Sequence, residues 1–172
     1  MRGPVFVVGM MGSGKTTVGR CLAAREGAAF CDLDQRLERI TGSTVAALFE
    51  SGETGFRALE RAALRSLVAE PGFAARACVV ATGGGVVIDP DNRATMRRAG
   101  TIVYLDVPVA ELLRRLGDEV HTRPLLRGGA PQAVLEVLLA DRQAAYTGGA
   151  IAVDGTGTPD IVAARIVEVL GA

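Results

Sequence analysis

The stretch that decides the fold of this chain lies near its start and reads Gly9-Met10-Met11-Gly12-Ser13-Gly14-Lys15-Thr16. It matches the P-loop pattern G-x-x-x-x-G-K-[ST]. The apolar run at residues 4–8 predicts a buried strand directly before it, and residues 17–25 predict a helix that ends near Gly27. A strand before the pattern and a helix after it favour a phosphate-binding loop over a chance glycine-rich turn.

Each residue type in this stretch suits a phosphate ligand. Glycine lets the backbone wrap closely around an anion, where a Cβ atom would collide with it. The exposed N–H groups of the turn and of the helix start then point at phosphate oxygens. Lys15 is expected to reach the β- and γ-phosphates, and the Thr16 hydroxyl to bind Mg²⁺. The residues expected to hold the nucleotide are Gly12, Ser13, Gly14, Lys15, Thr16 and Thr17.

The composition indicates one globular domain and argues against several classes of protein. The chain has 172 residues, which suits a single domain with a sizeable core. Apolar residues make up 49% of it, yet no apolar run approaches the roughly 20 residues of a membrane helix. Its 19 basic and 19 acidic side chains balance and it has no tryptophan, so no nucleic-acid surface is expected.

The start of the chain and its cysteines predict a cytoplasmic protein. The N-terminus carries one arginine and enters the first predicted strand at once, which does not fit a signal peptide. Cys21, Cys31 and Cys78 are far apart and lack the spacing of metal ligands. We therefore expect buried, reduced thiols in a reducing cytoplasm.

Predicted strands and helices alternate along the chain. This alternation predicts one α/β domain over residues 1–172, with a parallel sheet and helices on both of its faces. The polar segment at 117–129, which carries arginines and is bounded by glycines, predicts a mobile lid. The strands are expected at 4–8, 28–34, 77–81, 101–105 and 150–153, and the helices at 17–25, 35–40, 44–50, 56–69, 89–99, 108–116, 131–146 and 159–170.

Two acids, Asp32 and Asp34, end the second predicted strand, so their side chains are expected to point the same way. The carboxyl ends of parallel strands form the rim where such sheets bind ligands. A phosphoryl transferase needs acids to hold Mg²⁺, usually through water, and to orient the attacking hydroxyl. We assign the first task to Asp32 and the second to Asp34. The alternative is that one of them, Asp34 above all, only caps the next helix.

Arg57 and Glu60 lie three positions apart on one predicted helix and have two interpretations. As a pair in solvent they would contribute only ~0.2–0.5 kcal/mol. In the functional interpretation, Glu60 steadies Arg57, which grips an anionic substrate group as a bidentate fork. The charge pattern alone favours the solvent pair.

Three glycines at 83–85 follow the third predicted strand directly. Glycine at a strand end discards the side chain where another group approaches the backbone closely. A flexible turn would have the same composition and is the alternative. We favour close approach at these glycines.

The predicted lid carries Arg123, and Arg142 lies on the next helix, four residues before Tyr146. An arginine delivered by a closing lid stabilises charge on a transferring phosphoryl group, and closure excludes the water that would compete as nucleophile. His121, the only histidine, lies in the same segment. We expect it to face solvent rather than to act as a base.

Taken together, these motifs resemble those of the shikimate kinases, a family of small P-loop kinases, over nearly the whole chain. A P-loop alone says nothing about the substrate, whereas the ordered set is specific. In order, the matching features are the P-loop at 9–16, the Asp-x-Asp at 32–34, the Gly-Glu-x-x-Phe-Arg-x-x-Glu run at 52–60, the glycines at 83–85, the Arg-Pro-Leu-Leu from Arg123 and the Arg-x-x-x-Tyr from Arg142.

The resemblance implies phosphorylation of the 3-hydroxyl of shikimate by ATP with Mg²⁺, a step of aromatic amino-acid biosynthesis. It also implies a three-layer P-loop kinase fold with a five-stranded parallel sheet in the order 2-3-1-4-5, a mobile lid and a monomer. Lys15, Asp34 and Arg123 would act in catalysis, with Arg123 also contacting ATP. The residues implied to contact shikimate are Asp34, Arg57, Gly84 and Arg142.

Two stretches depart from the family pattern. After Tyr146 the chain reads Thr-Gly-Gly-Ala, where the family more often has an acid and bulkier residues. Residues 154–159 lack a basic residue that some members place near adenine, which leaves Arg115 and Pro159 as the candidates for that contact. Two other functions stay open: a related small-molecule kinase, such as one for gluconate, and an ATP-binding regulatory module without turnover.

Overall fold

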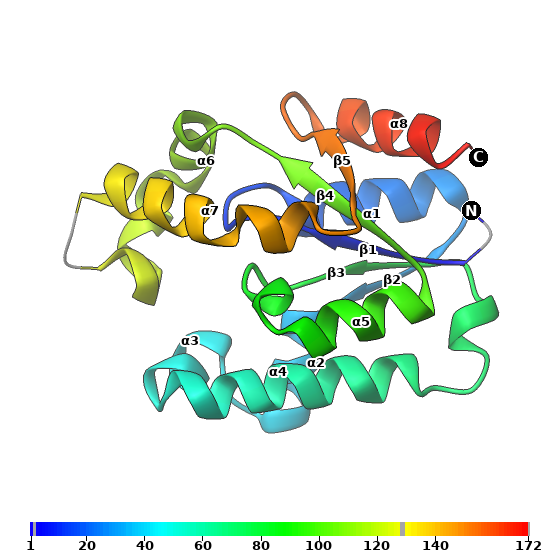
Figure 1. The fold of residues 1–172 in the computed structure, drawn as a ribbon, viewed down its shortest axis with the longest axis horizontal. Coiled ribbons are helices and arrows are strands. Elements are labelled where there is room, and N and C mark those ends of the chain that lie inside the picture. The colour runs from blue at the N-terminus through cyan, green and yellow to red at the C-terminus, as the bar shows by residue number, and fades with distance from the viewer. Residues whose placement is uncertain (2, 128–129, 172) are drawn as a thin grey trace.

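The computed structural model describes residues 1, 3–127 and 130–171, which form a five-stranded parallel sheet with helices on both sides (Figure 1). The strand order is β2-β3-β1-β4-β5, as predicted. The strands are β1 (Pro4–Val8), β2 (Ala29–Asp32), β3 (Cys78–Ala81), β4 (Thr101–Asp106) and β5 (Ile151–Asp154). The helices in these ranges are α1 (Lys15–Glu26), α2 (Leu33–Thr41), α3 (Val45–Glu50), α4 (Glu53–Val68), α5 (Pro90–Ala99), α6 (Val109–Leu116), α7 (Pro131–Thr147) and α8 (Pro159–Leu170).

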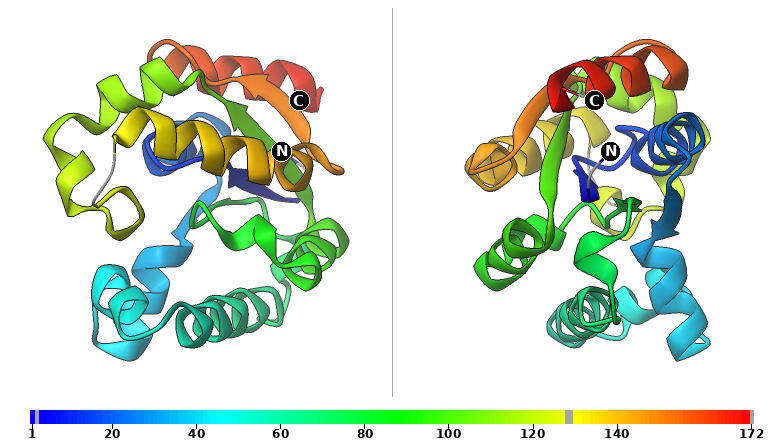
Figure 2. Two further views of the ribbon diagram at one scale, coloured as in Figure 1. Left: turned by 60° about the vertical axis from the view of Figure 1, so that its left-hand side comes forward. Right: turned by 90° about the vertical axis from the view of Figure 1, so that its right-hand side faces the viewer.

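Alternate residues of the central strand face two separate cores. Phe6 and Val8 of β1 pack in a core with α4, α5 and α7, whereas Val5 and Val7 pack in a core with α1 and α8. Strands covered on both faces are apolar along their whole length, which is the pattern that β1 has. Two helical layers therefore enclose the sheet, as the two views of Figure 2 show.

The P-loop connects β1 to α1 and needs its glycines for their backbone conformation. Gly12 and Gly14 have φ angles of 79° and 89°, in the region that favours glycine. α1 begins at Lys15, two residues before the predicted start, and ends at Glu26 with Gly27 as its C-cap, near the predicted end. The order of strand, turn and helix expected from the sequence is confirmed.

The second strand is shorter than the sequence predicts. β2 ends at Asp32 and α2 begins at once, although residues 28–34 were expected to form the strand. The cause is a helix cap, because the Asp32 carboxylate accepts a hydrogen bond from the Gln35 N–H at 3.1 Å. Asp34 therefore lies in the first turn of α2. The helix cap is therefore Asp32 and not Asp34. Because Asp34 lies in a helix, the two side chains do not point the same way through the alternation of a strand, contrary to the sequence prediction.

The predicted lid contains two short 3₁₀ helices, η3 (Gly117–Thr122) and η4 (Pro124–Leu126). Residues 128 and 129 of that segment lie outside the described residues, and the mobility of the lid stays a prediction. Two other 3₁₀ turns were not predicted, η1 (Phe73–Ala75) and η2 (Val86–Ile88). Within the described ranges, no helix has the length and apolar character needed to span a membrane.

The three cysteines are free thiols, as expected, but they are not all buried. Cys78 is buried in β3, whereas Cys21 and Cys31 are partly exposed. The sequence prediction of buried thiols is therefore correct for Cys78 alone.

Candidate active site

The start of α1 has no side-chain cap, a feature that it shares with α4, α6 and α7. Its N-cap residue is Gly14, whereas α2, α3, α5 and α8 have capping side chains, from Asp32, Thr44, Asp89 and Thr158. The N–H groups of the first turn of α1 are thus left for a ligand, at the positive end of the helix dipole. This is the arrangement of an anion site.

A cavity of about 430 Å³ opens at this helix start. Of the residues predicted to hold the nucleotide, Gly12, Gly14, Lys15, Thr16 and Thr17 line it. The sixth, Ser13, is fully buried and its N–H donates to the Met10 carbonyl at 3.1 Å. The two candidates for the adenine contact, Arg115 and Pro159, also line this cavity.

Lys15 folds back over the P-loop. Its ammonium donates to the Met10 carbonyl at 2.8 Å and lies 3.5 Å from Ser13 Oγ. Burial lowers the pKa of Lys15 to about 8, and Arg123 lowers it further, while the carboxylates of Asp34 and Asp32 oppose the shift. Burial therefore disfavours the charged form of Lys15, and a phosphate bound beside the ammonium would stabilise that form.

The Thr16 hydroxyl donates to the Asp32 carboxylate at 2.6 Å. The same carboxylate caps α2, so Asp32 has both of its oxygens engaged. No cluster of three or more His, Cys, Asp or Glu side chains that would hold a metal by itself occurs among the described residues. A hydroxyl beside one carboxylate fits Mg²⁺, which is usually held by one or two carboxylates together with waters and substrate phosphates.

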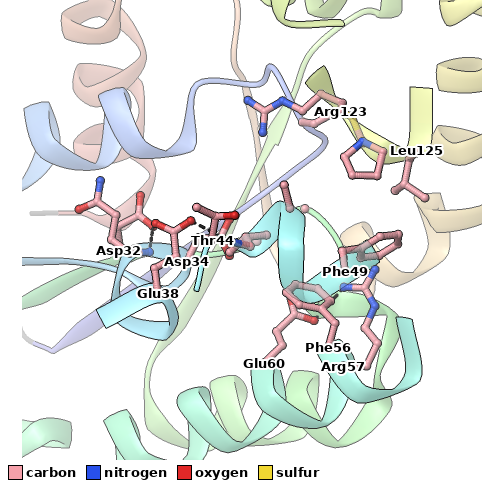
Figure 3. A pocket seen from close by; sticks show the side chains of 18 of the residues that line it. Asp32, Asp34, Glu38, Thr44, Phe49, Phe56, Arg57, Glu60, Arg123 and Leu125 are labelled. Atoms are coloured by element: carbon pink, nitrogen blue, oxygen red, sulfur yellow. Dashed lines mark hydrogen bonds and ion pairs between the residues drawn. The ribbon is translucent and has the colours of Figure 1, made fainter. Parts of the chain in front are cut away.

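Asp34 points into the space between the P-loop and the acids of α2 and α4 (Figure 3). Burial raises the pKa of its carboxyl above the usual range, the Asp32 carboxylate adds to the shift, and the Lys15 ammonium opposes it. A raised pKa brings a carboxyl group closer to the range in which it exchanges protons near neutral pH.

Gly83 and Gly85 lie close against charged side chains that leave little room for a Cβ atom. A Cβ atom on Gly83 would lie 2.7 Å from Glu60 Oε1 and 2.9 Å from Asp34 Oδ1. A Cβ atom on Gly85 would lie 2.6 Å from an Arg57 guanidinium nitrogen. Close approach, rather than a merely flexible turn, therefore explains Gly83 and Gly85. The groups that approach are three charged side chains of the site. A Cβ atom on Gly84 would make only ordinary contacts, the nearest at 3.4 Å from the Met11 nitrogen.

Arg57 and Glu60 do not form the solvent pair that their charge pattern favours. The Glu60 side chain is only 2% exposed and accepts from Arg57 Nη1 at 2.9 Å. Arg57 also pairs with Glu53 at 3.1 Å and lies over the rings of Phe49 and Phe56. The other Glu60 oxygen, Oε1, is buried with no hydrogen-bond partner within the described part of the chain. The solvent interpretation is wrong because this helix face lines a cavity.

Arg142 and Tyr146 reach the same region from α7, and both are buried. The Tyr146 hydroxyl donates to the Gly84 carbonyl, and its ring stacks on that of Tyr104 with 5.0 Å between ring centres. Tyr146 was part of a predicted motif but had no predicted task. A hydrogen bond to a backbone carbonyl leaves no signature in the partner's residue type, so the sequence did not indicate this contact.

The lid contributes Arg123, which donates to the Glu119 carboxylate at 2.9 Å. The Arg123 side chain is 45% exposed. In Figure 3 it lies across the opening from Asp34, with Leu125 beside it. His121 is exposed, as the sequence predicted.

A second cavity, of about 480 Å³, adjoins the first. Arg57, Glu60 and Arg142 line it together with apolar side chains that include Phe49, Phe56 and Leu125. Five residues line both cavities: Met11, Thr16, Asp34, Gly84 and Arg123. A ligand in one cavity therefore meets a ligand in the other next to the P-loop, beside a buried carboxyl group and a lid arginine.

The sequence as a whole matches a known family. The family model described as shikimate kinase matches residues 11–171. The chain belongs to the shikimate kinase family. It is 41% identical to the shikimate kinase of Synechococcus elongatus, over 96% of this chain and 85% of that one. It also resembles the structure of the shikimate kinase from Acinetobacter baumannii in complex with shikimate, with a TM-score of 0.90 and 37% identity over 98% of this chain and 92% of that one.

The fold extends beyond this family. A gluconokinase from Sinorhizobium meliloti superimposes with a TM-score of 0.60 at 21% identity, over 99% of this chain and 96% of that one. Likeness at this level concerns the fold alone. The P-loop kinase fold of this shikimate kinase family member is thus shared with kinases for other acceptors.

Removing the Tyr146 hydroxyl tests its contact with Gly84. We expect Tyr146→Phe to lower the free energy of unfolding by about 1–2 kcal/mol, because a partly buried carbonyl loses its donor while the ring stack remains. Tyr104→Phe is the matched control, since its hydroxyl donates to the exposed Asp106 carboxylate at 3.2 Å and water can replace it there. Urea titration measures both, and equal effects would contradict the assignment.

Proposed function

We propose that this protein transfers the γ-phosphoryl group of ATP to the 3-hydroxyl of shikimate, giving shikimate 3-phosphate and ADP in aromatic amino-acid biosynthesis. The observation that carries the proposal is the pair of adjoining cavities that share Thr16, Asp34 and Arg123. One cavity begins at an uncapped helix start, and the other contains Arg57 and Arg142 in addition to the shared Arg123. A kinase needs such a pair, one site for each substrate, meeting at the reacting atoms.

In this proposal the nucleotide occupies the cavity of the P-loop. The N–H groups at the start of α1 and the Lys15 ammonium bind the phosphates, and the base lies toward Arg115 and Pro159. Lys15 exchanges its bond to the Met10 carbonyl for the β- and γ-phosphates. Arg123 adds positive charge from the lid.

Thr16 and Asp32 would hold Mg²⁺, with Asp32 acting through water. Their hydrogen bond at 2.6 Å already places a hydroxyl and a carboxylate side by side at the edge of the phosphate cavity. The ion would supply positive charge that stabilises the phosphates.

Shikimate occupies the other cavity, with its carboxylate toward Arg57 and Arg142. Planar guanidinium groups bind a carboxylate through paired hydrogen bonds. The ring lies against the apolar walls, and its hydroxyl groups lie toward Gly84 and Asp34. The unpartnered Glu60 oxygen gives this cavity a further acceptor for a hydroxyl.

Catalysis then consists mainly of positioning and charge stabilisation. Asp34 accepts a hydrogen bond from the 3-hydroxyl and takes up its proton as that oxygen bonds to the γ-phosphorus. The bond from the γ-phosphorus to the oxygen of the β-phosphate breaks, and ADP leaves with that oxygen. Lys15 and Arg123 balance the charge that develops on the phosphoryl oxygens.

The direct test is ADP release with shikimate, gluconate or no acceptor. We expect shikimate alone to stimulate release, because the acid cavity combines two arginines with the glycines at 83–85. A preference for gluconate would favour a sugar-acid kinase. Binding of ATP and shikimate in a calorimeter with no product would favour a regulatory module.

We further propose that the chain acts as a monomeric single domain in the cytoplasm, with no nucleic-acid or membrane partner.

Asp34→Asn tests the acid that orients the acceptor. We expect kcat to fall by roughly 10²–10⁴-fold, the usual range for a positioned acid–base group, with ADP affinity within about twofold of the parent. Asp106→Asn is the control, because it removes a carboxylate at the end of β4 that lines neither cavity. Turnover near the parent rate in the Asp34 variant would remove its catalytic assignment.

Arg142→Met tests recognition of the carboxylate. Loss of one charge-assisted pair should raise the KM for shikimate about tenfold to a hundredfold, while the KM for ATP stays within about twofold. Arg97→Met, on the exposed face of α5, removes the same charge outside both cavities and should change neither constant. A parallel rise in both KM values would indicate general damage to the site instead.

The lowered pKa of Lys15 predicts how nucleotide binding depends on pH. The group is charged below its pKa of about 8 and loses that charge as the pH rises through it. ADP affinity should therefore be nearly constant from pH 7 to 8 and fall by up to about tenfold per pH unit above 8, because the neutral amine of Lys15 no longer attracts phosphate. Calorimetry between pH 7 and 9.5 measures this, and a flat profile would contradict it.

A further inference from the structure

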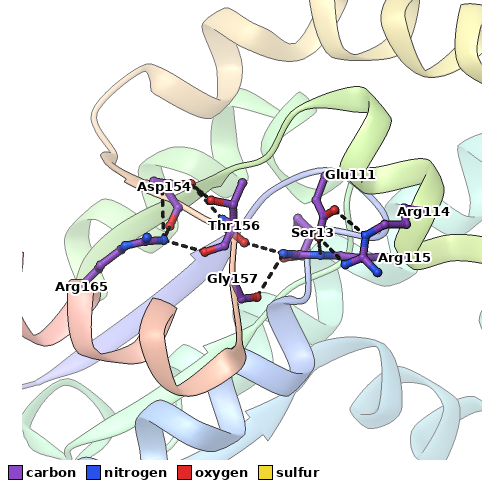
Figure 4. A network of polar contacts seen from close by, with 9 residues as sticks. Ser13, Glu111, Arg114, Arg115, Asp154, Thr156, Gly157 and Arg165 are labelled. Carbon is purple, nitrogen blue, oxygen red and sulfur yellow. Dashed lines mark hydrogen bonds and ion pairs between the residues drawn. The ribbon is translucent and has the colours of Figure 1, made fainter.

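The segment that links β5 to α8 is held by two arginines from different elements (Figure 4). Arg115 of α6 donates to the carbonyls of Gly155, at 2.9 Å, and Gly157, at 3.4 Å. Arg165 of α8 donates to the carbonyls of Asp154, at 2.9 Å, and Thr156, at 2.6 Å. Four successive carbonyl groups are thus bound alternately by one arginine and the other.

The Arg115 side of this arrangement belongs to the nucleotide cavity. Arg115, Gly155, Gly157 and Pro159 line that cavity, and Arg115 also donates to the Ser13 carbonyl of the P-loop at 3.1 Å. The segment is thereby joined to the loop that binds the phosphates. Its position decides where the wall of the cavity lies relative to the P-loop.

The Arg165 side lies outside both cavities. Besides its two carbonyl bonds, the Arg165 guanidinium forms an ion pair with the Asp154 carboxylate at 3.1 Å. That carboxylate in turn accepts from the Thr156 N–H at 2.9 Å and from the Thr156 hydroxyl at 2.7 Å. One side chain of α8 thus fixes a turn that its own residue types leave flexible, because two of its members are glycine.

We propose that Arg165 is a positioning residue for the base end of the nucleotide. By binding the carbonyls of Asp154 and Thr156 from the side of α8, it keeps those of Gly155 and Gly157 turned toward Arg115. A planar guanidinium suits this task, because it presents several N–H groups in a fixed geometry. Arg165 itself touches no substrate. The inference rests on the proposed function, in that the cavity beside the P-loop must bind ATP.

The test compares a nucleotide with a ligand that has phosphates and no base. We expect Arg165→Met to raise the dissociation constant of ADP about threefold to tenfold, because the wall of the cavity must be ordered on binding. The dissociation constant of inorganic tripolyphosphate should stay within about twofold of the parent, since the P-loop is untouched. The KM for shikimate should also stay within about twofold.

Two further variants separate positioning from loss of charge. Arg25→Met, at the exposed end of α1 in the same helical layer, removes one positive charge away from the segment and should leave both ligands unaffected. Arg165→Lys retains the charge and should give an ADP affinity between those of the parent and the Met variant. If Arg165→Met does not fold, Thr156→Val removes one bond of the same turn and should weaken ADP in the same selective way.

The outcomes are distinct. Equal weakening of ADP and tripolyphosphate, or unchanged ADP affinity in a folded variant, would overturn the role of Arg165. Failure of the parent protein to bind ADP would instead overturn the proposed function, and this binding is measured without shikimate. Selective weakening of ADP supports the inference.

Discussion

The hydrogen bond from the Thr16 hydroxyl to the Asp32 carboxylate joins the ends of two strands that are not neighbours. β1 leads into the P-loop and β2 ends at Asp32, while β3 lies between them in the sheet. The chain that leaves β3 therefore emerges among the acids of the site. At Gly83 a Cβ atom would lie too close to Asp34 and Glu60, which favours glycine at that position. The acids gathered at this edge of the sheet thus limit which residue can follow β3.

The same crowding determines the electrostatics of the site. Burial lowers the pKa of Lys15 and raises that of Asp34, so the two pKa values lie closer together than those of the free side chains. Each partly compensates the other, and Glu60 is held in the same way by Arg57. In the absence of ligands, these buried charges carry an unfavourable free energy of desolvation. In the proposed function, phosphates beside Lys15 and a carboxylate beside Arg57 and Arg142 would supply the missing opposite charges.

Local patterns in the sequence predicted the P-loop, the order of strands and helices and the parallel sheet, because apolar periodicity and glycine positions are local signals. The first turn of α2 was missed although Asp32 and Gln35 have the spacing of a helix cap. The burial of Glu60 was not predictable, since a pair of charges three residues apart does not reveal which helix face is covered. The carbonyls bound by Arg115 and Arg165 were equally hidden, because backbone acceptors have no residue signature.

The two cavities draw on different parts of the chain, and this division bears on how the fold serves different acceptors. The cavity beside the P-loop is lined by the P-loop and α1, which follow directly from the central strand, and also by α6, the lid and the segment that links β5 to α8. The other cavity is lined mainly by α2, α3, α4, the lid and α7, which surround that strand without being part of the sheet. In the proposed function, the residues that contact the acceptor therefore lie mainly in these surrounding elements. A gluconokinase shares the fold at 21% identity, and the choice of acceptor depends on site residues that a fold does not determine.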